Sequence, residues 1–128
     1  MSSIKITKSI IILERQRALI LRELRNIRYM VRGSYGLAHR RCGKPNCWCA
    51  QEEKGHPYHR ITWTKNAQPG TRTIPAHDVE WIKEMTGNYR RYQELKNLLR
   101  EKHQELKLLL NQRKNKIISR TKKQRKYL

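Results

Sequence analysis

Phenylalanine is absent from this chain of 128 residues, and hydrophobic residues make up only 37% of it. That amount fills one small core with helical extensions, and it excludes a large enzyme domain. Asp78 is the only aspartate, and no pair of carboxylates suited to acid–base catalysis stands near the cysteines. We therefore expect a protein that is not an enzyme.

Long apolar runs are also missing. The longest strictly apolar run near the start, Ile10 to Leu13, is far shorter than the ~20 residues of a membrane span or the about 7–15 residues of a signal-peptide core. We therefore expect the protein in a reducing cytoplasm, where thiols stay free to bind metal.

Acidic residues are scarce. The chain has 30 Lys and Arg against 10 Asp and Glu, which gives a formal net charge of +20, and no acidic residue follows Glu105. Repulsion at this level destabilises a compact state unless a polyanion relieves it, and a phosphate backbone is the usual polyanion. We expect nucleic acid as the partner rather than a membrane, because no helix joins a large aromatic-rich apolar face to a basic one.

Cysteines are few, but all three lie close together, at Cys42, Cys47 and Cys49. An odd, tight cluster is unsuited to a disulfide framework but supplies most of a zinc site, which needs four tetrahedral sulfur or nitrogen ligands. The candidates for the fourth ligand, in order of preference, are His56, His59 and His39. Four protein ligands leave no open position, so we expect a structural Zn²⁺ ion.

Two other interpretations of the cysteines stay open. Free cysteines pack in cores as small hydrophobic residues, and a redox or catalytic thiol is the remaining alternative. Glu52 and Glu53 follow Cys49 closely, but a glutamate acts as a base on zinc-bound water only where zinc keeps an open position.

Apolar residues at alternating steps of four and three predict a first amphipathic helix over residues 1–32, ending at Gly33. Its seam contains one charged residue, Arg17, among apolar ones. The apolar seam residues are Ile6, Ile10, Leu13, Ile20, Leu24, Ile27 and Val31. A second seam predicts a long helix over residues 76–112, and its apolar positions are Met85, Tyr92, Leu95, Leu99, Leu106 and Leu109.

Between the two helices, residues 33–75 are rich in glycine and proline and favour short elements. Residues 58–64 predict one strand, with Ile61 and Trp63 on the same face, and residues 71–74 the return strand after a turn at 65–70. We expect a mainly α protein, with two long helices, as a hairpin or a coiled coil, flanking a zinc-stapled knuckle and β-hairpin. Residues 113–128 form a basic tail.

The basic residues predicted to contact nucleic acid form three groups. In the middle segment they are Arg40, Arg41, Lys44, Arg60 and Arg72. On the first helix they are Arg22, Arg25, Arg28 and Arg32. In the tail they are Arg113, Lys114, Lys116, Arg120, Lys122, Lys123, Arg125 and Lys126. Trp48 and Tyr58 are candidates for stacking on unpaired bases, whereas we assign Trp63 to the core.

The middle segment also resembles a prokaryotic family of unknown function. The residues that carry the resemblance spell R-G-S from Arg32, C-G-K-P-N-C-W-C-A from Cys42, H-P-Y from His56, and the later Trp63. The resemblance implies a small basic zinc-knuckle protein of a prokaryotic cell, with some members near mobile elements and no established activity.

We therefore expect a non-enzymatic accessory DNA-binding factor of a mobile element, associated with the nucleoid. The alternatives are an RNA-binding ribonucleoprotein component and a coiled-coil adaptor that recruits a recombinase or nuclease. Self-association through either helical seam is equally compatible with the sequence.

Overall fold

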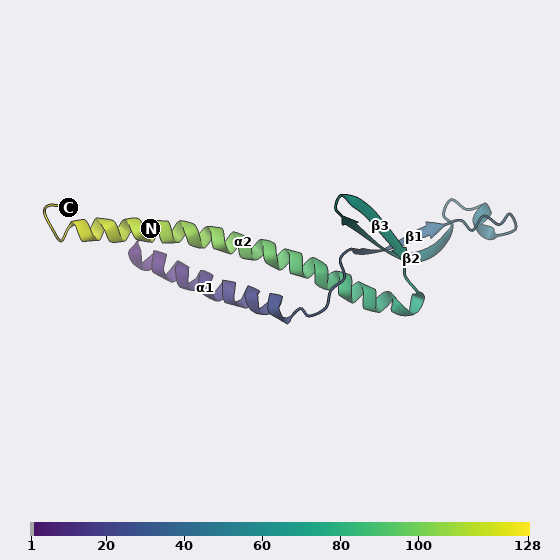
Figure 1. The fold of residues 1–128 in the computed structure, drawn as a ribbon, viewed down its shortest axis with the longest axis horizontal. Helices are drawn as coiled ribbons and strands as arrows, with labels where there is room; N and C mark the ends of the chain where they lie inside the picture. Colours follow the sequence, from purple (N-terminus) through teal and green to yellow (C-terminus); the bar gives the residue numbers. More distant parts are fainter. Residues whose placement is uncertain (1) are drawn as a thin grey trace. The chain divides into compact units, whose positions relative to one another are not determined.

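The computed structural model describes residues 2–128 of the chain. The elements, in chain order, are α1 (Ser3–Asn26), β1 (Ser34–Arg40), the short 3-10 helix η1 (Trp48–Ala50), β2 (His56–Lys65), β3 (Gln68–Thr73), the short 3-10 helix η2 (Ala76–Asp78) and α2 (Val79–Lys122) (Figure 1). The prediction of a mainly helical protein with a small antiparallel sheet is confirmed.

The chain divides into two compact units. The sheet unit is Arg28–Arg91, and the helical unit is α1 as far as Ile27 together with Tyr92–Leu128. Within residues 2–128, neither helix carries an apolar stretch long enough to cross a bilayer.

In the helical unit, α1 begins at the predicted seam and buries it. The Ser2 side chain caps the helix by accepting a hydrogen bond from the Lys5 amide at 3.2 Å. The buried residues of α1 are Ile6, Ile10, Leu13 and Ile20. All four belong to the predicted seam, so the periodicity identified the face that packs.

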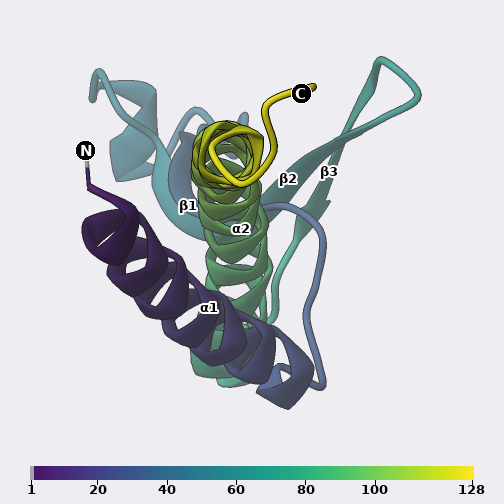
Figure 2. The same ribbon diagram turned by 90° about the vertical axis from the view of Figure 1, so that its left-hand side faces the viewer.

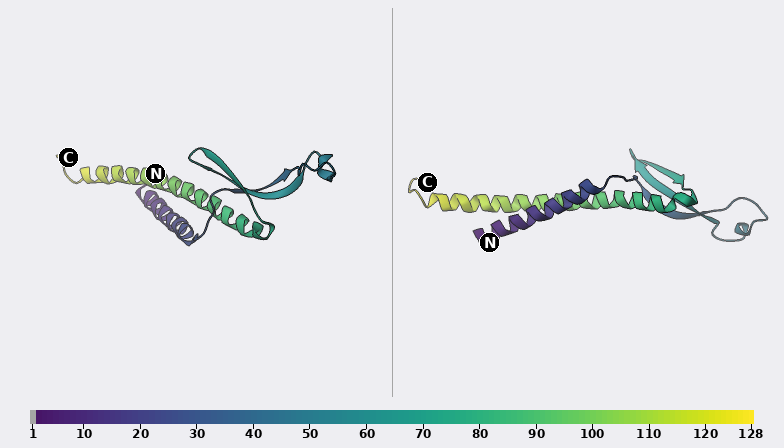
Figure 3. Two further views of the ribbon diagram at one scale, coloured as in Figure 1. Left: turned by 45° about the vertical axis from the view of Figure 1, so that its right-hand side comes forward. Right: turned by 90° about the horizontal axis from the view of Figure 1, so that it is seen from below.

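The two helices of this unit run antiparallel (Figures 2 and 3). Ile6, near the start of α1, shares a surface hollow with Ser119, near the end of α2. Leu13, further along α1, shares another with Lys102, further back along α2. Because the α1 seam is buried in this pairing, the chain forms the helical hairpin that was one of the two predicted arrangements.

The predicted end of the first helix at residue 32 is wrong, because α1 ends at Asn26. The chain that follows is extended and bonds to the start of α2: the Val31 amide donates to the Met85 carbonyl at 3.1 Å, and the Asn88 side-chain amide donates to the Tyr29 carbonyl at 3.0 Å. These bonds replace helical ones, so the helical pattern is overridden by contacts with a distant segment. Arg28 and Arg32 therefore lie outside the helix.

The sheet has three antiparallel strands in the order β1-β2-β3, rather than the two predicted. β1 pairs with β2 from Ser34 opposite Thr62 to Arg40 opposite His56. Gly33, with φ of +133°, takes a conformation that favours glycine, and a Cβ there would collide with the Thr62 carbonyl. This glycine therefore introduces β1 instead of ending α1.

The turn between β2 and β3 is tighter than predicted. Only Asn66 and Ala67 connect the strands, and both have positive φ, 53° and 62°. That geometry suits the twist of a two-residue hairpin turn. Pro69 and Gly70, which were predicted to lie in the turn, belong to β3. β3 is an edge strand, where proline is tolerated because the backbone N–H that it lacks can face solvent.

One face of the sheet packs on the first turns of α2. Ile61, Ile74, Val79 and Ile82 form the buried cluster, and Trp63 packs against it. The indole of Trp63 lies over Gly70, where any Cβ would collide with the ring. The assignment of Trp63 to packing agrees with this contact.

α2 has 44 residues and continues past the predicted boundary at residue 112 to Lys122. It begins at Val79, after η2, rather than at residue 76. Residues 113–122 contain five Lys or Arg, which are strong helix formers, and no Gly or Pro that would end a helix. The first ten residues of the predicted tail are therefore helical.

Candidate metal centre and basic surfaces

The three cysteines and His56 come together at one end of the sheet. Their ligand atoms all lie within 4.8 Å of one another. Cys42 follows β1, Cys47 and Cys49 flank Trp48 around η1, and His56 opens β2. The antiparallel pairing of Arg40 with His56 closes the loop, and so brings residues far apart in the loop to one point.

Short turns shape this metal loop, which we define as residues 41–55. Gly43 has φ of +80°, and the Cys47 amide donates to the Lys44 carbonyl at 3.2 Å. Gly55 is buried against the backbone of Arg40 and Arg41, where a Cβ would overlap the Arg40 carbonyl. A glycine at this position is therefore required for the loop to close.

The donor spacing is close to that around a tetrahedral metal ion. The Cys42 and Cys49 sulfurs are 3.5 Å apart, and the Cys47 sulfur lies 3.1 Å from His56 Nε2. A tetrahedral zinc ion separates its ligand atoms by about 3.5–3.8 Å, given Zn–S of about 2.3 Å and Zn–N of about 2.0 Å. Three cysteines and a histidine are thus close enough to hold a metal ion.

His56 is the histidine that the fold brings to the cysteines, and the two alternatives lie elsewhere. His59 Nδ1 is 2.7 Å from the Tyr35 hydroxyl, and its ring stacks on that tyrosine on the side of the sheet that faces α2. His39 is exposed and does not belong to the cluster. The first-ranked candidate for the fourth ligand is therefore the one placed to bind.

The acidity of the thiols differs across the cluster. A hydrogen bond from the Lys44 backbone, with smaller contributions from Cys49 and His56, lowers the pKa of the Cys42 thiol from 9.0 to about 6. A backbone hydrogen bond from Cys42 also acts to lower the pKa of Cys49, but burial and the nearby Cys42 and Cys47 sulfurs outweigh it and raise that pKa. This arrangement of the loop therefore favours the Cys42 thiolate at neutral pH, which is the form that binds metal.

Immediately after a chelator removes the metal, while the loop still has the arrangement described here, we expect Cys42 to be alkylated before Cys49. Because the pKa of Cys42 lies at about 6, its thiolate forms as the pH rises through about 6, whereas Cys49 stays a buried thiol at neutral pH. Brief iodoacetamide pulses at pH values from about 5 to 9, followed by peptide mass spectrometry, measure both rates. Faster labelling of Cys49, or a Cys42 midpoint near its ordinary pKa, would contradict this assignment.

The predicted basic residues of the middle segment do not form one surface. Arg60 pairs with Thr73, whereas Arg72 pairs with Ile61, so the two arginines lie on opposite faces of the sheet. Arg41 donates to the Glu52 carbonyl at 2.6 Å and so holds the metal loop. Lys44 is exposed on that loop.

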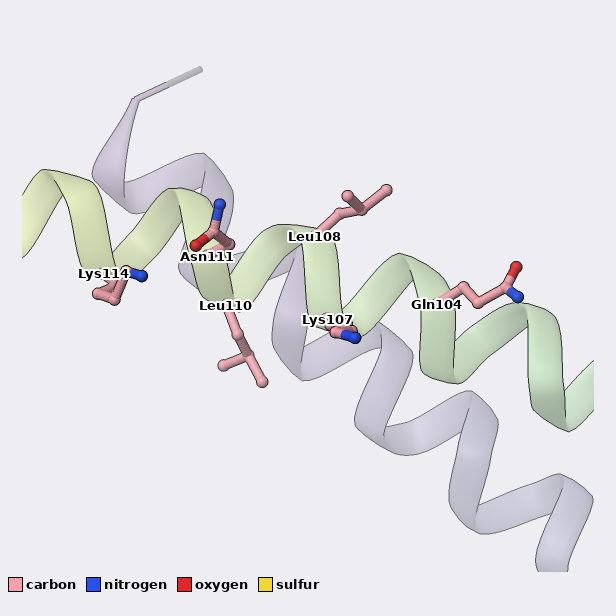
Figure 4. Close-up of a pocket in the computed structure, with 6 residues that line it drawn as sticks. All are labelled: Gln104, Lys107, Leu108, Leu110, Asn111 and Lys114. Atoms are coloured by element: carbon pink, nitrogen blue, oxygen red, sulfur yellow. The ribbon is translucent and has the colours of Figure 1, made fainter.

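Every predicted contact residue on the two helices is exposed. On α1 these are Arg22 and Arg25, and at the end of α2 and beyond they are Arg113, Lys114, Lys116, Arg120, Lys122, Lys123, Arg125 and Lys126. Sequence reasoning missed a stripe further back on α2, which Figure 4 shows. The stripe consists of Gln104, Lys107 and Asn111 and continues to the predicted Lys114, and the exposed Leu108 and Leu110 line the same hollow. Its spacing of three, four and three residues, which marks one helix face, was the available signal.

A comparison with protein families finds a match, which includes the candidate metal ligands and the sheet. A family model described as "Domain of unknown function (DUF6788)" matches residues 10–84. The match contains all four candidate metal ligands and the whole sheet. No curated protein and no solved structure matches the chain. Because the family model covers more than half of the chain, the protein belongs to the DUF6788 family, and the resemblance to a family of unknown function is confirmed.

Proposed function

We propose that this protein is a non-enzymatic nucleic-acid-binding protein with a structural zinc ion in its Cys3His cluster. The observation that carries the proposal is the excess of positive charge at the end of α2. The helix continues to Lys122, and no acidic residue follows Glu105. A helix of this composition lacks the oppositely charged partners that usually support an exposed helix.

Within this segment, like charges on the same helix face repel one another. Lys116 and Arg120 stand four residues apart, both exposed, and like charges at this spacing destabilise a helix by about 0.2–0.5 kcal/mol per pair. A phosphate backbone supplies the missing negative charge, and contact with it releases condensed counterions. Binding nucleic acid therefore both relieves the repulsion and gains free energy.

The stripe on α2 extends this basic surface. Lys107 and Lys114 lie two turns apart on one face, with the amides of Gln104 and Asn111 beside them (Figure 4). Glu105 lies away from this face, in the groove shared with α1, where its carboxylate is 4.0 Å from Lys102 Nζ. Cations and amides that donate hydrogen bonds are the side chains that usually contact phosphate.

Zinc is the metal that suits the cluster. Three thiolates and an imidazole favour a soft or borderline ion in tetrahedral geometry, and they supply all four ligands. A closed site has no position for a substrate or reactive water, so the ion has a structural role. Its effect is to hold the metal loop and the strand ends in one arrangement.

The alternative of a coiled-coil adaptor has less support. Both helical seams were its proposed contact surfaces, and the α1 seam is buried within the helical unit at Ile6, Ile10, Leu13 and Ile20. The exposed apolar residues that remain on this unit include Ile4, Ile12, Leu19 and Leu108. Apolar contacts persist in high salt whereas phosphate contacts weaken, so salt separates the two functions.

The test of the proposal is the salt dependence of binding. If about eight phosphates are contacted, log K for duplex DNA falls with log salt at a slope of about −7. Fluorescence anisotropy with matched duplex DNA, single-stranded DNA and structured RNA, from about 50 to 200 mM salt, measures the slope and separates DNA from RNA as the partner. Absence of binding at low salt to all three polymers would contradict the proposal.

A further inference from the structure

The sheet unit has one face on which no residue of the three strands is fully buried. We define this open face as the side of the sheet that carries Arg40, His56, Tyr58, Arg60, Thr71 and Thr73. None of these residues is buried, whereas the opposite side buries Ile61 against the start of α2. A sheet face of this kind is available to a ligand.

The charge of the open face is of one sign. β1, β2 and β3 contain no acidic residue. Arg40 and Arg60 therefore have no carboxylate beside them on the sheet. Thr71 and Thr73, on β3 next to the strand of Arg60, are small and offer hydroxyl groups. The face is suited to an anionic ligand that lies flat across the strands.

One arginine on the face is already ordered. The Arg40 guanidinium carbon lies 4.7 Å from the centre of the Tyr58 ring, in a cation–π contact. A stacked guanidinium keeps its edges free for phosphate oxygens, and it loses less conformational freedom on binding than a mobile side chain. Arg40 is therefore preorganised to contact a phosphate.

The exposed aromatic ring of Trp48 lies next to His56, at the end of the open face. The Trp48 ring centre lies 4.8 Å from that of His56, at an interplanar angle of 70°. His56 Nε2 is in turn 3.1 Å from the Cys47 sulfur, so the candidate metal ligands fix the position of the indole. Trp48 nevertheless remains 55% exposed, which leaves ring surface free for stacking.

We propose that the open face and Trp48 bind a single strand of nucleic acid. Trp48 stacks on an unpaired base, and Arg40 and Arg60 contact phosphates along β1 and β2. The bases of a duplex are paired and stacked inside, so they offer no free ring face to Trp48, whereas an unpaired strand does. This inference rests on the proposed function, and it adds the kind of strand and the surface that binds it.

Two pairs of variants test the inference, each with a control in the same unit. Trp48→Ala removes the stacking ring, and Trp81→Ala removes a tryptophan that is equally exposed, at 54%, on α2. Arg60→Gln removes a charge from the open face, and Arg72→Gln removes one from the opposite side of the sheet. Zinc content is measured for each variant, and the Arg60 pair lies outside the metal loop in case Trp48→Ala loses the ion.

For a single-stranded oligonucleotide we expect Trp48→Ala to weaken binding about 5- to 150-fold, the range for loss of one stacked base, while binding of the matched duplex changes little. Arg60→Gln should reduce the salt slope for the single strand by about 0.7, the value of one phosphate contact. Trp81→Ala and Arg72→Gln should leave single-strand binding unchanged.

Equal effects of Arg60→Gln and Arg72→Gln, or equal losses for single strand and duplex in zinc-loaded Trp48→Ala, would overturn the inference. In that case strong, salt-dependent binding by the unaltered protein would still support the proposed function. If the unaltered protein binds neither polymer at low salt, the proposed function fails together with the inference.

Discussion

Serine in place of Cys47 is expected to abolish tight metal binding and to disorder the metal loop, while both helices persist. The expected loss is large because the loop has no apolar core of its own: among residues 41–55, only Cys49 and Gly55 are buried. In small zinc modules the metal contributes about 10–16 kcal/mol of folding free energy. On the proposed assignment, a structural ion bound by four protein ligands takes the place of a hydrophobic core in this loop.

The helices are expected to survive because their packing does not depend on the loop. The helical unit buries Ile6, Leu13 and Leu95, and the sheet unit buries Ile61 against Ile82. Loss of the loop leaves these contacts in place. Amide hydrogen exchange should therefore rise in residues 41–55 and at the paired ends of β1 and β2, but not along α1 or α2.

A matched control is available one residue away. Asn46→Ser introduces the same side chain at an exposed position and keeps all four ligands. We expect one equivalent of zinc in the unaltered protein and in Asn46→Ser, and almost none in Cys47→Ser, by elemental analysis of freshly prepared protein. Full zinc content in Cys47→Ser would rule out this ligand set.

The sequence predicted those features that depend on local spacing. The buried face of α1 follows from steps of four and three residues, which place Ile6, Ile10 and Leu13 on one side of any helix. The cluster of cysteines with His56 follows from the short spacing of the cysteines and from the length of the connection that lets the chain turn back. Neither inference required knowledge of contacts between distant segments.

The features that the sequence did not predict depend on pairings across the chain. Gly36 and Ala38 are poor strand formers, so β1 is not evident until β2 lies beside it. The segment after Asn26 keeps the helical pattern, yet Val31 bonds to Met85, more than fifty residues away. The division of Arg60 and Arg72 between two faces likewise follows only from the register.

Neutralising cations at the end of α2 is expected to weaken the binding of every nucleic acid to about the same extent. The residues to change are chosen so that the packing of α1 on α2 is kept. Deletion of residues 113–128 would uncover Ile6, which is only 1% exposed and shares a hollow with Asn115, Lys116 and Ser119. We therefore propose to replace four cations that do not border this hollow with glutamine, a comparable helix former, so that the packing is kept. The four are Lys114, Arg120, Lys122 and Lys123.

If each of the four cations contacts one phosphate, the salt slope should fall from about −7 to about −3.5, because each contact contributes about 0.9. For duplex DNA the same relation gives a loss of several thousandfold in affinity at about 0.1 M salt. Exchanging Lys for Arg and Arg for Lys at the same four positions keeps the charge and should leave binding nearly unchanged. A loss confined to one base sequence would show that the end of α2 contacts bases, and an unchanged slope would show that it does not contact phosphate.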